Sequence, residues 1–172
     1  MMVKAVRVML APNNVQQTKM FQYAGAARFA YNWALAKEKD NYEKGGKFIS
    51  DSELRKEFTR LRNSAEYAWL QNVSNNVTKQ AIKDACIAYK NFFKSLQKYP
   101  RFKSKKKSTP KFYQDNIKIQ FSDTHVKFEG FSSSRKANKQ KLNWVRLAEH
   151  GRIPTDAKYM NPRISFDGLN WW

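Results

Sequence analysis

The chain has few residues of the kinds that form disulfides or bind metal ions. Its single cysteine, Cys86, excludes an internal disulfide and a cysteine-rich zinc site within this sequence. The two histidines, His125 and His150, lie far apart and have no obvious nucleophile or metal partner nearby. Most of the fourteen acidic residues are expected at helix caps, first turns and tight turns, and none form a clustered triad. We therefore predict no catalytic residue, no metal site and no cofactor in this chain.

Long apolar runs are also missing. No run approaches the roughly 20 residues that span a bilayer, so we expect no membrane partner. Lys4 and Arg7 interrupt the first apolar stretch, so we expect no signal peptide. A cytoplasmic setting follows as the default expectation.

Negative charge is absent where positive charge is densest. The thirty residues from Ala85 to Gln114 contain nine Lys or Arg, seven aromatic residues and no Asp or Glu. The whole chain has a formal charge of +19 and a pI of about 10.1. Cations that neutralise phosphates, interleaved with aromatic rings, are typical of nucleic-acid binding. A solvated basic loop is the alternative interpretation.

Hydrophobic patterning predicts an α+β fold. Length and 41% hydrophobic content allow one core, which could divide into two lobes. We expect a strand over residues 2–10, and a helix from Asn14, capped with Gln17, to Gly45. A short helix should start at the Ser50–Glu53 capping box, and a third should run from about Ser74 to Leu96. These three helices would then be inserted into a β module.

The remaining strands follow a basic segment. Alternating residues predict strands over residues 117–121, 126–128 and 142–147, and a final hairpin over residues 159–172 that turns at Asp167-Gly168. With the first strand they would make a small antiparallel, barrel-like β module. Trp171 and Trp172 allow two interpretations: an edge strand that tucks its tryptophans under the sheet, or a strand that begins a further, missing part.

Five segments resemble the transposon-encoded TnpB (OrfB) proteins. Residues 27–35, Ala-Arg-Phe-Ala-Tyr-Asn-Trp-Ala-Leu, are similar to the R-F-V-Y-N-W-A-L motif of their first helix. Residues 6–12 resemble their opening strand, residues 88–94 their A-x-x-x-F-F segment, and residues 99–103 their F-P-R-F-K segment. Residues 153–172 are similar to the β segment before their nuclease domain.

The resemblance implies a domain organisation. Residues 1–12 and 117–172 would form a wedge module, residues 13–98 an inserted helical recognition lobe of helix-turn-helix type, and residues 99–116 a basic linker. The family's RuvC-like nuclease, with its divalent metal, and its zinc ribbon would be absent. The gene would be prokaryotic or phage-borne. The expected partners are a guide RNA, double-stranded target DNA and a separate or missing nuclease domain.

Two helix starts offer groups that read duplex DNA in the major groove. In the family, matching positions contact the short motif beside the target, although the residues here differ from its common forms. Capping alone is the alternative role for Ser74 and Asn75. The predicted DNA-binding residues are Ser50, Asp51, Arg55, Ser74, Asn75, Asn76, Thr78, Lys79 and Tyr113.

A guide and target heteroduplex requires a positively charged lining rather than base-specific contacts. Tyr31, Trp33, Phe92 and Phe93 are instead assigned to the core by their helical spacing. The predicted RNA- and phosphate-binding residues are Lys90, Lys94, Arg101, Lys103, Lys105, Lys106, Lys107, Lys111, Arg135, Lys136, Lys139 and Lys141.

Three function classes are consistent with these features. The first is the nucleic-acid-binding N-terminal part of an RNA-guided DNA endonuclease, without catalytic residues of its own. The second is a stand-alone helix-turn-helix regulator of transposition or transcription. The third is a general RNA-binding protein.

Overall fold

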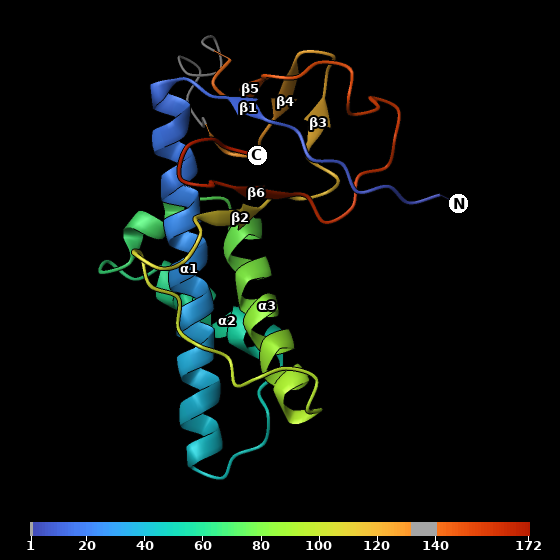
Figure 1. Ribbon diagram of the computed structural model, residues 1–172. Helices are drawn as coiled ribbons and strands as arrows, with labels where there is room; N and C mark the ends of the chain where they lie inside the picture. Colours follow the sequence, from blue (N-terminus) through green and yellow to red (C-terminus); the bar gives the residue numbers. More distant parts are fainter. Residues whose placement is uncertain (1, 132–140) are drawn as a thin grey trace. The chain divides into compact units, whose positions relative to one another are not determined.

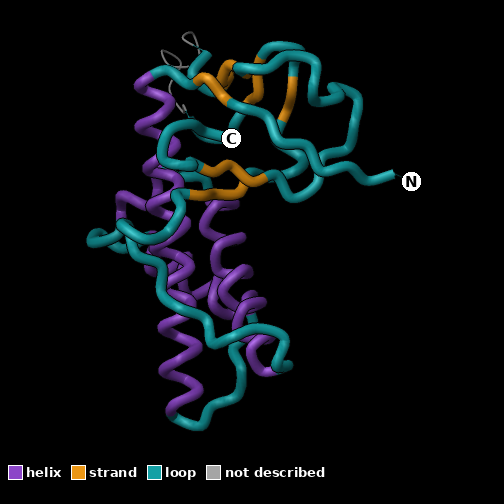
Figure 2. Tube along the Cα trace, in the orientation of Figure 1, coloured by secondary structure: helices purple, strands orange, loops and turns teal. Residues whose placement is uncertain are grey.

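The computed structural model describes residues 2–131 and 141–172 (Figure 1). Helices and short strands are both present, which confirms the α+β class (Figure 2). The chain forms two compact units. Unit 1 comprises residues 1–22 and 109–172, and unit 2 comprises residues 23–108. The assignment of a wedge module and a recognition lobe to these parts stays a prediction.

Helix α1, Asn14–Glu43, contributes its first residues to unit 1 and the others to unit 2. Its cap lies one residue before the predicted one. The Asn13 side chain accepts from the Gln16 backbone N–H (2.9 Å), and the Gln16 side chain accepts from the Asn13 N–H (3.0 Å). The buried Gln16 amide also donates to the carbonyls of Leu142 and Trp144, so it joins the helix start to the β structure of unit 1.

Unit 2 packs α1 against two further helices, α2 (Asp51–Arg62) and α3 (Asn75–Phe93), with the 3₁₀ helix η1 (Ala68–Asn72) between them. The predicted Ser50–Glu53 capping box is present. Glu38 of α1 is 2% exposed, accepts from the Ile49 N–H at 3.3 Å and lies 3.9 Å from the Cys86 thiol. Burial raises the pKa of the Glu38 carboxyl, and it raises that of Cys86 to about 12. The buried residues of α2 and α3 are Leu54, Phe58, Val77, Thr78, Ala81, Ile82, Ala85, Cys86 and Tyr89.

Helix α3 ends three residues before the predicted boundary. Ser95 adopts a left-handed conformation with φ of 57°, and its N–H donates to the Phe92 carbonyl. The Leu96 N–H donates to the Asn91 carbonyl at 2.9 Å. This pair of bonds is a Schellman motif, which closes a helix although the apolar spacing continues to Leu96.

Unit 1 contains two small antiparallel sheets. The first has the order β1-β5-β4-β3 and the second pairs β2 with β6. Among residues 2–131 and 141–172 these strands form two separate sheets rather than one closed barrel. The strands are β1 (Leu10–Ala11), β2 (Lys111–Tyr113), β3 (Gln120–Phe121), β4 (His125–Lys127), β5 (Trp144–Leu147) and β6 (Arg163–Ser165).

The strand predictions hold in position but not in length. The first strand is only two residues long, although Val8 and Leu10 are buried as their alternation indicated. β2 was missed because it lies inside the basic segment, where Pro110 and neighbouring lysines suggested a loop. Its Phe112 is buried and pairs in register with Ile164 of β6.

The final hairpin turns where it was predicted. The Asp167 N–H donates to the Asn170 carbonyl, and Trp171 forms bridges with Leu10 and Phe166. Trp171 is 2% exposed, so the tucked-edge interpretation is correct for this residue. Trp172 lies under the guanidinium of Arg7 at 4.1 Å and donates its indole N–H to Asp167. Hydrogen bonds from the Asn170 backbone, Trp172 and the Leu169 backbone lower the pKa of Asp167 to about 2.

Candidate nucleic-acid interface

A two-bond clamp holds the basic segment on α1. The Asn32 side-chain amide donates to the Lys103 carbonyl, and the Lys103 N–H donates to the Asn32 side-chain oxygen, both at 2.8 Å. Paired bonds of this kind fix a backbone in position as well as in direction. The clamp therefore fixes the segment that carries Lys103 alongside the middle of α1.

Tyr31, the residue before the clamp, orients the Lys103 side chain. The ammonium lies 3.8 Å from the centre of the Tyr31 ring, a distance at which a cation is attracted to the aromatic face. Tyr31 itself is buried, and burial together with the charge of Asp84 raises its pKa. The Lys103 charge is thus held at a defined position instead of moving freely.

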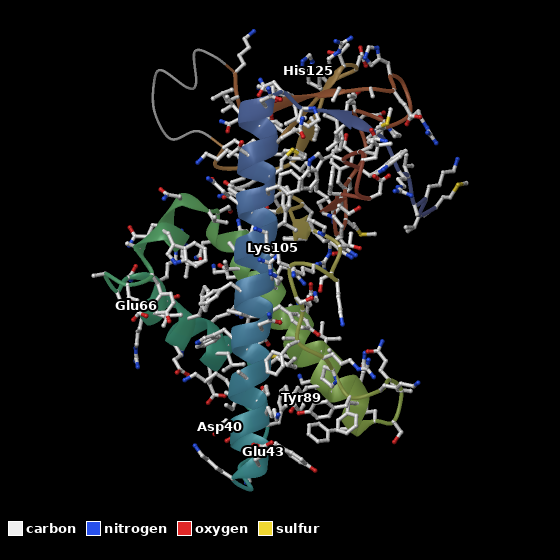
Figure 3. All side chains as sticks on the ribbon, turned by 60° about the vertical axis from the view of Figure 1, so that its left-hand side comes forward. Asp40, Glu43, Glu66, Tyr89, Lys105 and His125 are labelled. Atoms are coloured by element: carbon white, nitrogen blue, oxygen red, sulfur yellow. The ribbon has the colours of Figure 1, made fainter. Side chains whose placement is uncertain are left out.

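The three consecutive lysines lie on a turn beyond this clamp. The Lys107 N–H donates to the Ser104 hydroxyl at 3.1 Å, and the Ser108 N–H donates to the Ser104 carbonyl at 3.0 Å. Lys105, Lys106 and Lys107 are all exposed, and Figure 3 labels Lys105 in front of α1. An ordered turn that presents three ammonium groups to solvent is suited to contact a nucleic-acid backbone.

A second set of cations follows one face of α3. Lys79, Lys83, Lys90 and Lys94 recur at spacings of four, seven and four residues, which keeps them within one narrow stripe. The stripe covers about 22 Å at 1.5 Å per residue. Lys83, Lys90 and Lys94 are exposed, and Lys79 is half-buried.

Every described member of the predicted phosphate-binding set is exposed at the surface. Arg135, Lys136 and Lys139 lie outside the described residues. The described members in unit 2 are Lys90, Lys94, Arg101, Lys103, Lys105, Lys106 and Lys107, and those in unit 1 are Lys111 and Lys141.

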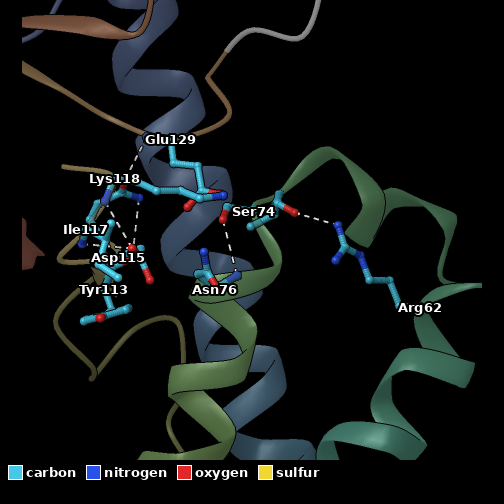
Figure 4. A network of polar contacts seen from close by, with 10 residues as sticks. Arg62, Ser74, Asn76, Tyr113, Asp115, Ile117, Lys118 and Glu129 are labelled. Atoms are coloured by element: carbon cyan, nitrogen blue, oxygen red, sulfur yellow. Dashed lines mark hydrogen bonds and ion pairs between the residues drawn. The ribbon is translucent and has the colours of Figure 1, made fainter. Parts of the chain in front are cut away.

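The start of α3 combines a cap with exposed polar groups. The Ser74 hydroxyl accepts from the Asn76 N–H at 3.3 Å, so the predicted capping role is confirmed (Figure 4). Asn75 and Lys79 are one turn apart and half-buried. Thr78 is 1% exposed, and its hydroxyl donates to the Asn75 carbonyl. The Thr78 side chain thus packs in the core of unit 2, and the DNA contact predicted for it stays a prediction.

The start of α2 is electrostatically different. The Ser50 hydroxyl donates to the Glu53 carboxylate at 2.7 Å and the Ser50 N–H donates to it at 3.0 Å, and these two bonds lower the pKa of Glu53. The Ser50 hydroxyl also accepts from the Glu53 N–H at 3.2 Å. Arg55 forms an ion pair with Asp51 at 3.2 Å and also donates to its carbonyl. Two carboxylates in this first turn already interact with the positive end of the helix dipole. The first turn of α3 has no acidic residue.

The two predicted DNA-reading starts lie at opposite ends of α2. The Arg62 guanidinium, at the end of α2, donates to the Val73 carbonyl just before α3 begins (Figure 4). Ile49, the residue before the α2 cap, donates its N–H to the Glu38 carboxylate. The thiol of Cys86, in the middle of α3, contacts the same carboxylate. The start of α3 therefore lies beside the end of α2, whereas the start of α2 lies toward the middle of α3; the twelve residues of α2 span about 18 Å.

Tyr113 belongs to unit 1, on β2. Its hydroxyl donates to Asn116 at 2.7 Å, and the Arg163 guanidinium lies 5.4 Å from the centre of its ring. The Asp115 carboxylate beside it accepts from the Ile117 and Lys118 N–H groups, which forms an ordered turn (Figure 4). The predicted DNA contact of Tyr113 stays a prediction.

The predicted core role of four aromatic residues holds only in part. Tyr31 is buried, whereas Trp33 and Phe92 are half-buried. Phe93 is 47% exposed, so its assignment to the core is wrong. Helical spacing placed Phe93 beside buried Tyr89, but the helix ends at this residue and leaves one side of its ring in solvent.

Among residues 2–131 and 141–172, no cluster of three or more His, Cys, Asp or Glu residues could hold a metal ion. The His125 ring contacts the Thr124 hydroxyl at 2.7 Å. In the same described part of the chain, every helix is too short or too polar to cross a membrane.

Sequence reasoning missed Asn32 as a functional residue. Its role depends on a contact with Lys103, 71 positions away, which no local pattern encodes. The available signal was the presence of both residues in separate motif-like segments, residues 27–35 and 99–103.

Comparison with known proteins identifies the class of the chain. Residues 1–47 match the family model of a helix-turn-helix domain that occurs in OrfB proteins. The chain is 29% identical over 170 residues to InsQ of Escherichia coli K12, which is named as a candidate RNA-guided DNA endonuclease. That alignment covers 99% of this chain and 39% of InsQ.

Two further relatives match shorter stretches. A candidate RNA-guided DNA endonuclease of Streptomyces pristinaespiralis is 30% identical over 105 residues, 61% of this chain and 26% of that protein. The virulence protein VsdF of Salmonella dublin is 27% identical over 113 residues, 60% of this chain and 95% of VsdF. The chain thus contains a match to the OrfB helix-turn-helix domain, and it is similar to TnpB-like proteins named as RNA-guided DNA endonucleases, spanning about 39% of the length of InsQ.

Proposed function

We propose that this chain is the nucleic-acid-binding part of a TnpB-like RNA-guided DNA endonuclease. In this proposal unit 1, with its two small antiparallel sheets, corresponds to the wedge module and the helices of unit 2 to the recognition lobe. The observation that carries the proposal is the Asn32–Lys103 clamp, which joins two motif-like segments and presents an ordered run of cations. The net charge of +19 supports a polyanionic partner.

Guide RNA is the partner that we assign to the exposed lysines and arginines. An A-form helix is recognised mainly through its backbone, so a row of cations meets the requirement without base-specific groups. The lysine turn at residues 105–107 and the stripe on α3 supply such a row in unit 2.

Target-adjacent duplex DNA is assigned to the start of α3 rather than that of α2. The first turn of α3 has the Ser74 cap and no carboxylate, whereas Asp51 and Glu53 would repel phosphates at α2. Asn75 and Lys79 are the side chains proposed to reach base edges. Arg55 would first have to leave its ion pair with Asp51.

Catalysis is not proposed for this chain. The divalent metal and zinc of the family would be held by a nuclease domain and a zinc ribbon outside residues 1–172. Plasmid cleavage with magnesium tests this point: we expect supercoiled plasmid to remain intact with highly purified protein, and metal-dependent nicking that copurifies with the chain would contradict the expectation.

The experiment that tests the proposed function is sequencing of RNA that copurifies with the chain. We expect one structured RNA species to be enriched over total RNA, and the enrichment should fall when Lys105, Lys106 and Lys107 are changed to Ala. RNA recovered in proportion to its cellular abundance would favour a general RNA-binding protein instead.

A second candidate function rests on the helix-turn-helix match over residues 1–47. A stand-alone regulator of transposition or transcription would bind a specific duplex without any RNA. Duplex selection after ribonuclease treatment separates the two: a strong consensus motif would favour the regulator, and loss of specific binding would favour the RNA-guided protein.

A further inference from the structure

Five aromatic rings form a continuous cluster where α3 ends. We call it the aromatic platform; it consists of Tyr42, Tyr89, Phe92, Phe93 and Tyr99. The ring of Phe93 lies 5.4 Å from that of Tyr42, 5.6 Å from that of Tyr89 and 5.5 Å from that of Phe92. Tyr99 adjoins Phe92 at 5.1 Å and Tyr89 at 5.6 Å. All five belong to unit 2.

The platform has an anchored inner layer and an exposed outer layer. Tyr89 is fully buried, and its hydroxyl contacts that of Tyr99 at 2.6 Å. Tyr42 is 54% exposed, Phe93 47% and Tyr99 39%. Packing against the inner rings holds the outer rings in place, so flat aromatic faces remain in water without much conformational freedom to lose on binding.

Positive charge surrounds the platform. Lys90, Lys94, Lys98 and Arg101 are all exposed on the same helix end and the segment that follows it. The nearby carboxylates are already paired, Asp40 with Lys44 at 2.8 Å and Glu43 with Lys39 at 3.8 Å. Figure 3 shows Asp40, Glu43 and Tyr89 toward the same end of α1. The segments that carry the platform therefore have an excess of positive charge.

We propose that the aromatic platform binds unpaired nucleotides of RNA by stacking bases on Tyr42 and Phe93. This inference rests on the proposed function and adds a single-stranded site to its backbone-binding surface. Exposed rings bordered by lysines fit a chain that alternates flat bases with phosphates, whereas an apolar peptide would leave the cations without partners. Tyrosine hydroxyls at the platform can hydrogen-bond to a ribose 2′-OH, which favours RNA over DNA.

Binding of a labelled oligouridine of about 12 nucleotides tests the proposal on the whole chain. Phe93→Leu and Tyr42→Leu keep an apolar side chain but remove the flat face, and they lie on different helices. Each should weaken binding by about fivefold or more, while the slope of log affinity against log salt stays unchanged. Trp69→Leu is the matched control, since Trp69 is 45% exposed outside the platform, and it should bind as wild type does.

The outcomes separate this inference from the proposed function. If both platform variants are folded by circular dichroism and bind oligouridine as tightly as Trp69→Leu, the platform does not stack bases. An oligodeoxyuridine of the same length should bind more weakly than oligouridine, and equal affinity would overturn the assignment to RNA. A structured RNA is measured in parallel. Salt-sensitive binding of that RNA by all variants would leave the proposed function standing even if the platform inference failed.

Discussion

Asn32 and Lys103 are joined by two hydrogen bonds of 2.8 Å, one in each direction between a side-chain amide and a backbone peptide. Because the pair lies 71 residues apart, it fixes the path of the basic segment along α1. Tyr31 adds a contact to the ammonium of the same lysine. Two neighbouring residues of α1 thus determine both where Lys103 lies and where its charge is directed.

Asn32→Ala should release the basic segment. We expect a stability loss of only about 0.5 to 1.5 kcal/mol, because the freed Lys103 peptide is exposed and regains water. Amide hydrogen exchange at Lys103 should accelerate, and RNA affinity should fall. Asn72→Ala, at an exposed asparagine of η1, is the control. Unchanged exchange at Lys103 would mean that the clamp does not hold the segment.

The lysine turn should account for part of the salt dependence of RNA binding. Changing Lys105, Lys106 and Lys107 to Ala removes up to three phosphate contacts, so the slope of log affinity against log salt should fall by about two units. The control triple variant changes Lys4, Lys118 and Lys158 to Ala, which removes the same charge from exposed positions in unit 1. If the slope of log affinity against log salt is the same for both triple variants, Lys105, Lys106 and Lys107 belong to a solvated loop that does not contact the RNA.

The start of α3 should read duplex sequence. Asn75→Ala and Lys79→Ala should each relax preference at one or two base pairs, with a loss of about 1 to 3 kcal/mol per base contact. Selection from randomised duplexes, with the cognate RNA and any downstream domain present, measures this effect. Lys83→Ala, one turn farther along the same face, should weaken binding uniformly. Identical selected motifs for wild type and both variants would leave these residues with capping or solvated roles only.

Ser95→Gly should stabilise unit 2. Ser95 has a φ of 57°, a conformation that costs an L-residue about 1 to 2 kcal/mol and costs glycine little. The expected net gain is about 0.5 to 1 kcal/mol after the added entropy of the unfolded chain is subtracted. Thermal unfolding measures it. Ser52→Gly, in the ordinary helical conformation of α2, should destabilise, and a loss of stability in both variants would show that the Schellman closure is unimportant.

Sequence reasoning predicted the elements that depend on local chemistry. The capping box at Ser50, the cap at Ser74 and the turn at Asp167 are formed by residues within three positions of one another, so spacing alone identifies them. The short first strand and β2 could not be predicted in this way. Their bounds depend on pairing with β5 and β6, which lie far along the chain.

In the candidate site, too, features set by nearby residues were predicted and features set by distant contacts were not. Exposure of the lysines at residues 105–107 follows from their composition, and the structure agrees. Burial of Thr78 and exposure of Phe93 were not predictable from helical spacing, because each depends on what packs at a helix end. The two helix starts are separated by α2 because the end of α2, at Arg62, contacts Val73 just before α3, and this contact is not visible in the sequence.

The measurement that tests the central claim most directly is ultraviolet crosslinking of the chain to its copurified RNA, followed by identification of the crosslinked peptides. The account predicts crosslinks at Tyr42 and within residues 90–111, which include the clamped segment, the lysine turn and the rest of the exposed platform, and it predicts none when the RNA is eluted at high salt before irradiation. Crosslinks confined to other exposed lysines, such as Lys4 and Lys158, with residues 90–111 unmodified, would contradict it.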